Sequence, residues 1–303
     1  MFKTFSKKII SLFITFVVIL PLLPASAPAM ALQMPQNGNE LASMSNINAK
    51  AYIVTDLETG KTLIDSNADM LWTPASLTKL VTALVVLDTK PKLTKVVAMT
   101  KADQIAGGCS VGGECIKTIV GTKFTVDGLF HAALMPSANN AANALARSTG
   151  LSSSQFVAKM NAKVKSLGAT NSHFTEPTGM DPANKITASD YAKIVSAAFS
   201  NTYLKNIAQL KTYALRSTNS SKYTQTIKNT DGLLTSNDVK IVGAKTGYLN
   251  ESLYNFASVL KYNNGSQLAI VVLGENHLYS AFSDTTILAS LAEQSRNLAF
   301  ASN

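Results

Sequence analysis

A serine and a lysine stand three residues apart at the start of an apolar segment. In "LWTPASLTKLVTALVVLD", residues 71 to 88, Ser76 and Lys79 precede apolar positions at helical spacing. Residues i and i+3 of a helix share a face, so the lysine amine would lie beside the serine hydroxyl. Burial or a second cation lowers the pKa of a lysine, and such an amine could accept the serine proton near neutral pH. The pair could therefore create a nucleophilic serine.

The same spacing also has a purely structural interpretation. The serine could cap a helix while the lysine amine reaches solvent along an apolar surface. Ser258 and Lys261 repeat the spacing inside a strand-like stretch, and we interpret that repeat as accidental. Taken alone, the pair favours the structural interpretation, and a chemical role needs further residues.

Two more short motifs contain residues that could bind a substrate. In "LMPSANNAAN", Ser137 and Asn139 follow a proline-initiated turn ahead of an Ala/Asn helix, where they could line a cleft or simply cap the helix. In "GAKTGYL", Lys245, Thr246 and Gly247 lie on a predicted strand. The lysine and threonine could together bind a carboxylate, and the glycine would let a substrate approach the backbone closely.

The order of the three motifs is more specific than any one of them. The Ser-x-Asn turn comes 61 residues after the first serine (76 to 137), and the Lys-Thr-Gly strand 108 residues later (137 to 245). This order matches the penicillin-recognising serine enzymes. From about residue 51 to 292 the chain resembles their low-molecular-mass penicillin-binding proteins, the serine-type D-alanyl-D-alanine carboxypeptidase family. The blocks "PASLTKLVTA", "LGATNSHFTEPTGMD", "KNTDGLL" and "VVLGENHLYSAFSDT" carry the resemblance.

The resemblance implies a fold and a reaction. The fold is α+β, β-lactamase/transpeptidase-like, with an antiparallel sheet covered by helices and an inserted all-helical region. Ser76 attacks the bond between two D-alanines and Lys79 is its base. Ser137 passes a proton towards the leaving amine, and Asn139 holds Lys79 and the substrate backbone.

The resemblance also implies how the substrate is held. Lys245 and Thr246 bind the terminal carboxylate, with Gly247 beside them. The backbone N–H groups of Ser76 and Tyr248 form the oxyanion hole. The implied partners are peptidoglycan stem peptides, with β-lactams as inhibitors that mimic D-Ala-D-Ala, and no cofactor is expected.

Three other functions stay open. Glu176 occupies a position where many carboxypeptidases have asparagine, and relatives that cleave cross-links often show Glu-Pro-Thr-Gly, which suggests a DD-endopeptidase. Glu176 also lies 39 residues after Ser137 (137 to 176), near where a class A β-lactamase could place a deacylating glutamate. The third alternative is a non-catalytic peptidoglycan-binding protein on the same scaffold.

Other catalytic centres have little support. The three histidines, His131, His173 and His277, have no convincing acid partner, and no H-E-x-x-H is present. Cys109 and Cys115 close a short glycine-rich loop, where we expect a disulfide rather than two free thiols. No histidine lies near them in sequence, so no metal site is expected. The loop could border the cleft or be a tethered surface loop.

The chain begins with a pattern typical of a secretory signal peptide. Lys3, Lys7 and Lys8 precede an apolar run, and Ala29-Met30-Ala31 offers a cleavage site. We expect a signal peptide over 1–31, a linker over 32–49 and a peptidase domain over 50–303, with a helical subregion at about 90–210. A hairpin near 51–68 and strands after 240 can share one sheet. The second domain and C-terminal anchor of many relatives are not expected here.

Charge and composition limit the classes of molecule that the protein is expected to bind. Of 303 residues, 46% are hydrophobic, and the formal net charge is +9. Removing the three lysines of the predicted signal peptide leaves 24 Lys and Arg against 18 Asp and Glu, or +6. The remaining cations are scattered and aromatic residues make up 7%, which argues against nucleic-acid binding. We expect an extracytoplasmic protein without an obligate protein partner, anchored to a membrane only if the signal is not cleaved.

Overall fold

A computed structural model describes residues 47–262 and 264–301, and only the backbone of residues 296–301. The predicted signal peptide and residues 32–46 of the predicted linker therefore lie outside the described residues. Within the described ranges, no helix is both long and apolar enough to cross a membrane. The strands are β1 (Ala51–Asp56), β2 (Thr62–Ser66), β3 (Val96–Ala98), β4 (Lys123–Thr125), β5 (Thr212–Leu215), β6 (Gln225–Lys228), β7 (Lys240–Leu249), β8 (Leu253–Lys261) and β9 (Gln267–Glu275).

The helices fall mostly between β2 and β5. The α-helices are α2 (Thr78–Asp88), α3 (Lys101–Ala106), α4 (Val126–Leu134), α5 (Asn139–Ser148), α6 (Ser153–Ser166), α7 (Ala188–Ser200), α8 (Thr202–Ala208) and α9 (Leu278–Ala301), and the 3₁₀ turns are η1 (Ala75–Leu77), η2 (Ser221–Tyr223) and η3 (Gly232–Thr235).

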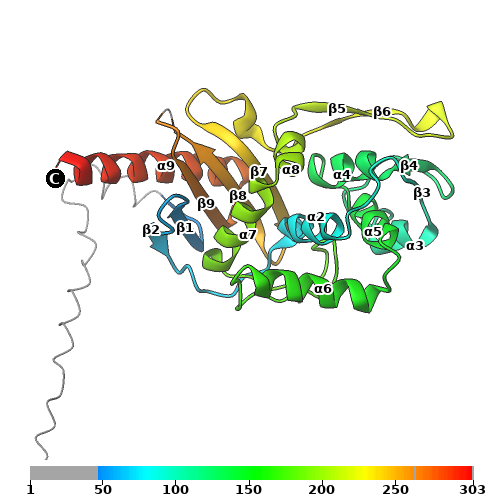
Figure 1. Cartoon of the computed structure of the whole chain (residues 1–303), viewed down its shortest axis with the longest axis horizontal. Helices are drawn as coiled ribbons and strands as arrows, with labels where there is room; N and C mark the ends of the chain where they lie inside the picture. Colours follow the sequence, from blue (N-terminus) through cyan, green and yellow to red (C-terminus); the bar gives the residue numbers. More distant parts are fainter. Residues whose placement is uncertain (1–46, 263, 302–303) are drawn as a thin grey trace, which may run out of the picture.

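The main sheet joins the two ends of the described chain. Its strand order is β2-β1-β9-β8-β7, and every neighbouring pair is antiparallel. The N-terminal hairpin and the C-terminal strands thus share one sheet, as the sequence predicted. This places β7, which carries the Lys-Thr-Gly motif, at the edge of the sheet that faces the helical part of the molecule (Figure 1).

Both faces of the sheet are covered by helices. Successive side chains of a strand point to opposite faces, so each strand contributes to two hydrophobic cores. On β9, Val271 belongs to the core beneath α7, while Ile270 and Val272 belong to the core beneath α9. Phe282 of α9 packs edge-on against Phe256 of β8, with ring centroids 4.9 Å apart. Figure 1 shows α7 on one side of the sheet and α9 on the other.

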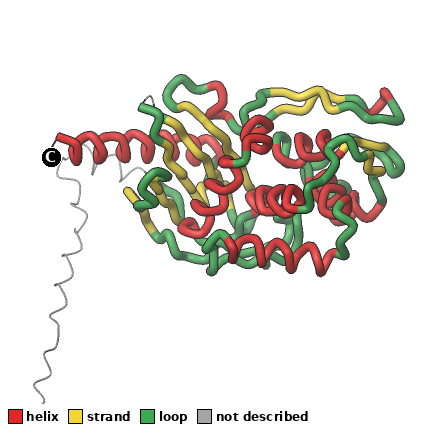
Figure 2. Tube along the Cα trace, in the orientation of Figure 1, coloured by secondary structure: helices red, strands yellow, loops and turns green. Residues whose placement is uncertain are grey.

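The helical lobe, residues 75–166, is built around α2. Helix α2 is buried from Thr78 to Val86, as its nearly continuous apolar sequence predicted. The predicted α+β fold class is correct, but the expected all-helical character of the inserted region is wrong. Strands β3 and β4 pair within it, and β5 and β6 form an arm that extends over α4 (Figure 2). Strands of three residues are too short to show a period of two in the sequence, so this pair could not be recognised.

Candidate active site

Ser76 lies on the tight turn that opens the buried helix. The turn η1 precedes α2 directly, and Ala75 has a left-handed backbone (φ 49°) that turns the half-buried Ser76 towards the cleft. One helical turn later, Lys79 is buried, and its Nζ lies 2.7 Å from Ser76 Oγ. Lys79 Nζ also donates to the carbonyl oxygen of Thr178 at 2.7 Å. The two bonds hold the amine against the hydroxyl.

Two glycines let neighbouring backbone approach this turn. A Cβ at Gly179 (φ +89°) would lie 1.8 Å from the carbonyl oxygen of Ala75, so no other residue fits there. A Cβ at Gly247 would lie 2.7 Å from the carbonyl oxygen of Pro74 and 3.3 Å from Ser76 N. Sequence reasoning assigned Gly247 to substrate approach, but its closest neighbour is the protein's own nucleophile turn.

The second serine stands opposite, on the turn before α5. Ser137 is buried and has a left-handed backbone (φ 68°), which is uncommon for a residue with a side chain. Lys245 Nζ of β7 donates to Ser137 Oγ at 2.8 Å and to the carbonyl oxygen of Thr246 at 2.9 Å. The two serine–lysine pairs therefore come from three separate segments, and the fold brings them to one place.

Burial changes the proton affinity of both lysines. Loss of solvation, followed by the positive charge of Lys245, holds the pKa of Lys79 well below the usual lysine range. Burial also lowers the pKa of Lys245, to about 7. An amine with a lowered pKa is available as a base at neutral pH. Lys79, whose amine lies against the Ser76 hydroxyl, is the one of the two placed to act as its base.

A cleft of about 800 Å³ opens above these groups. Ser76, Ser137, Asn139, Thr246 and Gly247 line it together with Tyr248. The hydroxyl groups of Thr246 and Thr230 lie 2.6 Å apart. The cleft thus has the Ser76 hydroxyl group on one wall and further hydroxyl groups with a buried lysine on the other. It could hold an extended peptide that ends in a carboxylate.

One predicted contact is absent. Asn139 does not hold Lys79, since its side-chain amide donates to the carbonyl oxygen of Gly107 at 3.1 Å, and Thr178 and Ser76 are the partners of Lys79. The motif spacing could not reveal this, because Gly107 approaches through a loop far from the motif in sequence. The Asn139 side-chain oxygen is buried without a hydrogen-bond partner in the described part of the chain.

Sequence reasoning also missed the residues that support Lys79. It singled out Glu176 in "FTEPTGMD", whereas the carbonyl group that holds the lysine belongs to Thr178. The Glu176 carboxylate accepts from Thr178 N at 2.7 Å, from Thr178 Oγ1 at 2.6 Å and from Asn184 Nδ2 at 2.8 Å. These bonds close the loop that presents the Thr178 carbonyl group to Lys79. Thr230 was missed too, although "KNTDGLL" was recognised as a family block.

The two cysteines and His131 make contacts that support the fold. Cys109 and Cys115 form a disulfide, with Cα atoms 5.6 Å apart. Their loop borders the cleft, which decides between the two placements that the sequence left open. His131 is buried, donates from Nδ1 to the carbonyl oxygen of Asp127 at 2.9 Å, and stacks on Tyr213. Within residues 47–262 and 264–301, no three His, Cys, Asp or Glu side chains gather in a metal-binding arrangement.

A serine hydroxyl beside a buried lysine, facing a cationic edge strand, defines a serine enzyme of the penicillin-recognising class. The family model described as D-alanyl-D-alanine carboxypeptidase matches residues 38–277. The chain therefore belongs to the serine D-alanyl-D-alanine carboxypeptidase family, the low-molecular-mass penicillin-binding proteins.

Individual relatives agree with this family. The chain is 33% identical over 284 residues to a D-alanyl-D-alanine endopeptidase of Pseudomonas aeruginosa, which covers 92% of this chain and 86% of the relative. It is 34% identical to a D-alanyl-D-alanine carboxypeptidase of Mycobacterium tuberculosis, over 74% of each chain. The crystal structure of the Streptomyces K15 DD-transpeptidase superposes with a TM-score of 0.76 at 30% identity, covering 82% of this chain and 98% of that one.

Proposed function

We propose that this protein removes the terminal D-alanine from peptidoglycan stem peptides through an acyl-enzyme on Ser76. The 2.7 Å separation of Lys79 Nζ and Ser76 Oγ carries the proposal. Because burial lowers the pKa of Lys79, the neutral amine can take the serine proton. The predicted signal peptide and the disulfide support an extracytoplasmic place of action.

The reaction divides among the two serine–lysine pairs. Ser76 Oγ attacks the carbonyl carbon between two D-alanines while its proton passes to Lys79. The backbone N–H groups of Ser76 and Tyr248 stabilise the negative oxygen of the tetrahedral intermediate. The C–N bond then breaks, and Ser137 relays a proton to the departing amine. Water hydrolyses the ester and frees Ser76 for the next turnover.

The opposite wall binds the leaving D-alanine. Lys245 and the hydroxyl group of Thr246 take its carboxylate, and this anion favours the charged form of Lys245. Asn139 lines the cleft, and its side-chain oxygen is buried without a hydrogen-bond partner in the described part of the chain, so we assign it as the acceptor of a backbone N–H of the peptide. This keeps for Asn139 the substrate-binding half of its predicted role.

The direct test is acylation by a fluorescent penicillin. The wild-type protein should be labelled and Ser76→Ala should not, because a β-lactam acylates the same serine. Ser258→Ala is the matched control, since it removes the serine of the second Ser-x-x-Lys sequence, on β8 and away from the cleft lining. Labelling of Ser76→Ala at the wild-type level would rule out the proposed nucleophile.

A second variant tests the base. Lys79→Ala should slow acylation by about 10²- to 10⁴-fold, the usual contribution of a general base. Thermal unfolding of the variant checks that the fold persists. Acylation of folded Lys79→Ala at the wild-type rate would assign the proton transfer to another group.

A DD-endopeptidase is the second candidate, because the Pseudomonas aeruginosa relative carries that name. Glu176 does not contact substrate directly, since it is absent from the cleft lining and bonds to its own loop. Mass spectrometry of products from a pentapeptide and a cross-linked dimer separates the two activities. Release of D-alanine from the pentapeptide alone supports the carboxypeptidase, and cleavage of the dimer supports the endopeptidase.

The other two alternatives have less support. A class A β-lactamase needs a carboxylate free to activate water, and the Glu176 carboxylate already accepts four hydrogen bonds, from Thr178, Gly179 and Asn184. Rapid penicillin hydrolysis without a stable adduct would favour that alternative. A non-catalytic binding protein would leave Ser76 unreactive in folded protein that still binds muropeptides.

A further inference from the structure

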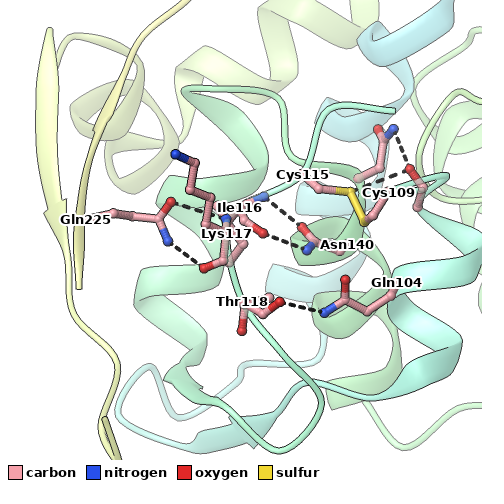
Figure 3. Close-up of a disulfide and its surroundings, with 10 residues drawn as sticks. Gln104, Cys109, Cys115, Ile116, Lys117, Thr118, Asn140 and Gln225 are labelled. Carbon is pink, nitrogen blue, oxygen red and sulfur yellow. Dashed lines mark hydrogen bonds between the residues drawn. A yellow bond between two sulfur atoms is a disulfide. The ribbon is translucent and has the colours of Figure 1, made fainter. Parts of the chain in front are cut away.

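A loop closed by the disulfide forms one wall of the cleft. We call residues 107–116 the disulfide loop. Cys109 and Cys115 are joined near its base (Figure 3), and residues 111–116 line the cleft. The loop therefore borders the site that holds Ser76, although it carries none of the three motifs.

The loop is fixed to the helix that follows the second serine. The carbonyl oxygen of Glu114 accepts from Asn139 N at 2.6 Å. Two residues later, Ile116 N donates to Asn140 Oδ1 and its carbonyl oxygen accepts from Asn140 Nδ2, each at 3.1 Å (Figure 3). With the Cys115 disulfide between these bonds, the backbone on both sides of Glu114 is held in place.

The Glu114 side chain is nevertheless available to a ligand. It is exposed, and within the part of the chain that the structure describes its carboxylate makes no hydrogen bond or ion pair. The other charged residues that line the cleft are Lys228 and Glu251. Burying such a carboxylate against a ligand without a cationic partner would be costly, so its position in the wall indicates a ligand with a positive charge.

Of the two carboxylates in the lining, Glu114 is the one whose negative charge acts on the lysines of the reaction centre. It opposes the lowering of the pKa of both Lys79 and Lys245. The residue before the attacked D-alanine lies about 3.5 Å along the extended peptide from the site of attack. A long side chain at that residue can therefore reach the wall beside Ser76.

We propose that the Glu114 carboxylate binds a side-chain ammonium on the residue that precedes the attacked D-alanine. The preferred substrates are then stem peptides whose diamino acid has a free amine. The proposal rests on the proposed function, because it takes Ser76 as the point of attack. Holding the loop by the disulfide and by Asn139 pre-orders the carboxylate, so less entropy is lost when the ammonium binds.

Two tripeptides that differ in one charge test the proposal. Nα-acetyl-Lys-D-Ala-D-Ala keeps the side-chain ammonium, and Nα,Nε-diacetyl-Lys-D-Ala-D-Ala lacks it. For the wild-type protein, kcat/KM for D-alanine release should be about two- to fivefold higher on the first peptide, the range for a solvent-accessible ion pair. Glu114→Gln should bring the ratio to about one. Added salt should lower the wild-type ratio, because it screens exposed charges.

Glu251→Gln is the matched control, since it removes the other carboxylate of the lining and should keep the wild-type ratio. A wild-type ratio of one, or a ratio that survives in Glu114→Gln, overturns the inference. So does a ratio that Glu251→Gln abolishes. Release from neither peptide by the wild type would instead contradict the proposed function, and the inference would fall with it. Equal thermal unfolding midpoints show that the two variants are folded.

Discussion

At the scale of single residues, the site depends on two lysines placed where lysines are costly. Lys79 and Lys245 are both buried, and each is bonded to a serine hydroxyl and a backbone carbonyl group. Water would hydrate a free ammonium better than these partners do, so burial lowers both pKa values. In the proposed function, this cost yields one amine that acts as a base and a second that binds an anion.

The lowered pKa of Lys245 predicts a pH dependence of stability. In the folded protein Lys245 loses its proton near pH 7, whereas an unfolded lysine keeps its proton to about pH 10.4. Above pH 7 the unfolded state therefore binds more protons, and the free energy of unfolding rises with pH. Relative to Lys245→Met, the wild-type protein should gain on the order of 2 kcal/mol between pH 7 and pH 9.

Urea denaturation of both proteins at the two pH values measures this difference. The comparison with Lys245→Met cancels the titration of groups remote from Lys245, whereas the pKa of Lys79 rises in the variant because the charge of Lys245 no longer lowers it. A difference that is constant or falls with pH would mean that Lys245 stays protonated in the folded state.

At the scale of elements, the nucleophile turn is clamped by segments from distant parts of the chain. Tyr191 of α7 donates its buried hydroxyl to the carbonyl oxygen of Leu77 at 2.6 Å. Asn255 of β8 donates to the carbonyl oxygen of Thr73 at 3.0 Å. The backbone at Gly179 and at Gly247 also packs closely against the turn. Ser76 is therefore placed by a helix, a sheet and a loop together, not by its own helix alone.

The close approach of Gly179 predicts the effect of adding one methyl group. Gly179→Ala should destabilise the fold by about 1–3 kcal/mol or more, since the methyl group would overlap the carbonyl group of Ala75. Penicillin acylation should also fall at least tenfold, because the overlap displaces the backbone next to Ser76 and moves the hydroxyl from Lys79.

Gly150→Ala is the matched control for this variant. Gly150 has a similar φ of +80°, but nothing lies within 4 Å of its added Cβ. It should therefore show only the backbone cost of about 1 kcal/mol and keep wild-type acylation. Urea denaturation and the acylation rate are the measurements. Equal effects of the two substitutions would show that the steric contact with Ala75 does not matter.

At the scale of the whole molecule, the cleft and the hydrophobic core between the sheet and α9 lie in different parts of the fold. The nucleophile turn, the Ser137 turn and β7 meet between the sheet and the helical lobe. Helix α9 reaches the cleft only through Leu278 at its start, and the rest of it covers the far face of the sheet (Figure 1). Stability contributed by α9 should therefore be separable from the geometry of the site.

Truncating an aromatic side chain on the buried face of α9 tests this separation. Phe282 is buried against Phe256 and does not line the cleft. Phe282→Ala should lower the free energy of unfolding by about 3–5 kcal/mol through lost burial and the cavity left behind. At a temperature where the variant is folded, penicillin acylation should stay within about twofold of the wild type, since a remote core change leaves an unconnected site intact.

Chemical denaturation and the acylation rate, measured on the same samples, decide the outcome. Phe282→Leu, which keeps most of the volume, should show a smaller loss of stability with unchanged acylation. A large fall in acylation of folded Phe282→Ala would show that packing under α9 is coupled to the cleft.

The sequence by itself determined the motifs, their order and most of the elements that carry them. Helix α2 and strands β7, β8 and β9 were recognisable because long apolar or alternating segments have few other stable arrangements. The expectation that the N-terminal hairpin shares a sheet with the C-terminal strands is confirmed, since apolar strand faces must be covered. Spacing alone also placed Lys79 one turn from Ser76.

The tertiary structure decided which partners these residues meet. That Lys245 bonds to Ser137, that the Thr178 carbonyl group holds Lys79, and that Asn139 is bonded to Gly107 all depend on contacts between segments distant in sequence. Backbone carbonyl groups leave no residue-type signal, because every residue has one. Local patterns report what a segment prefers on its own, whereas the direction of a buried side chain is set by the packing of the whole chain around it.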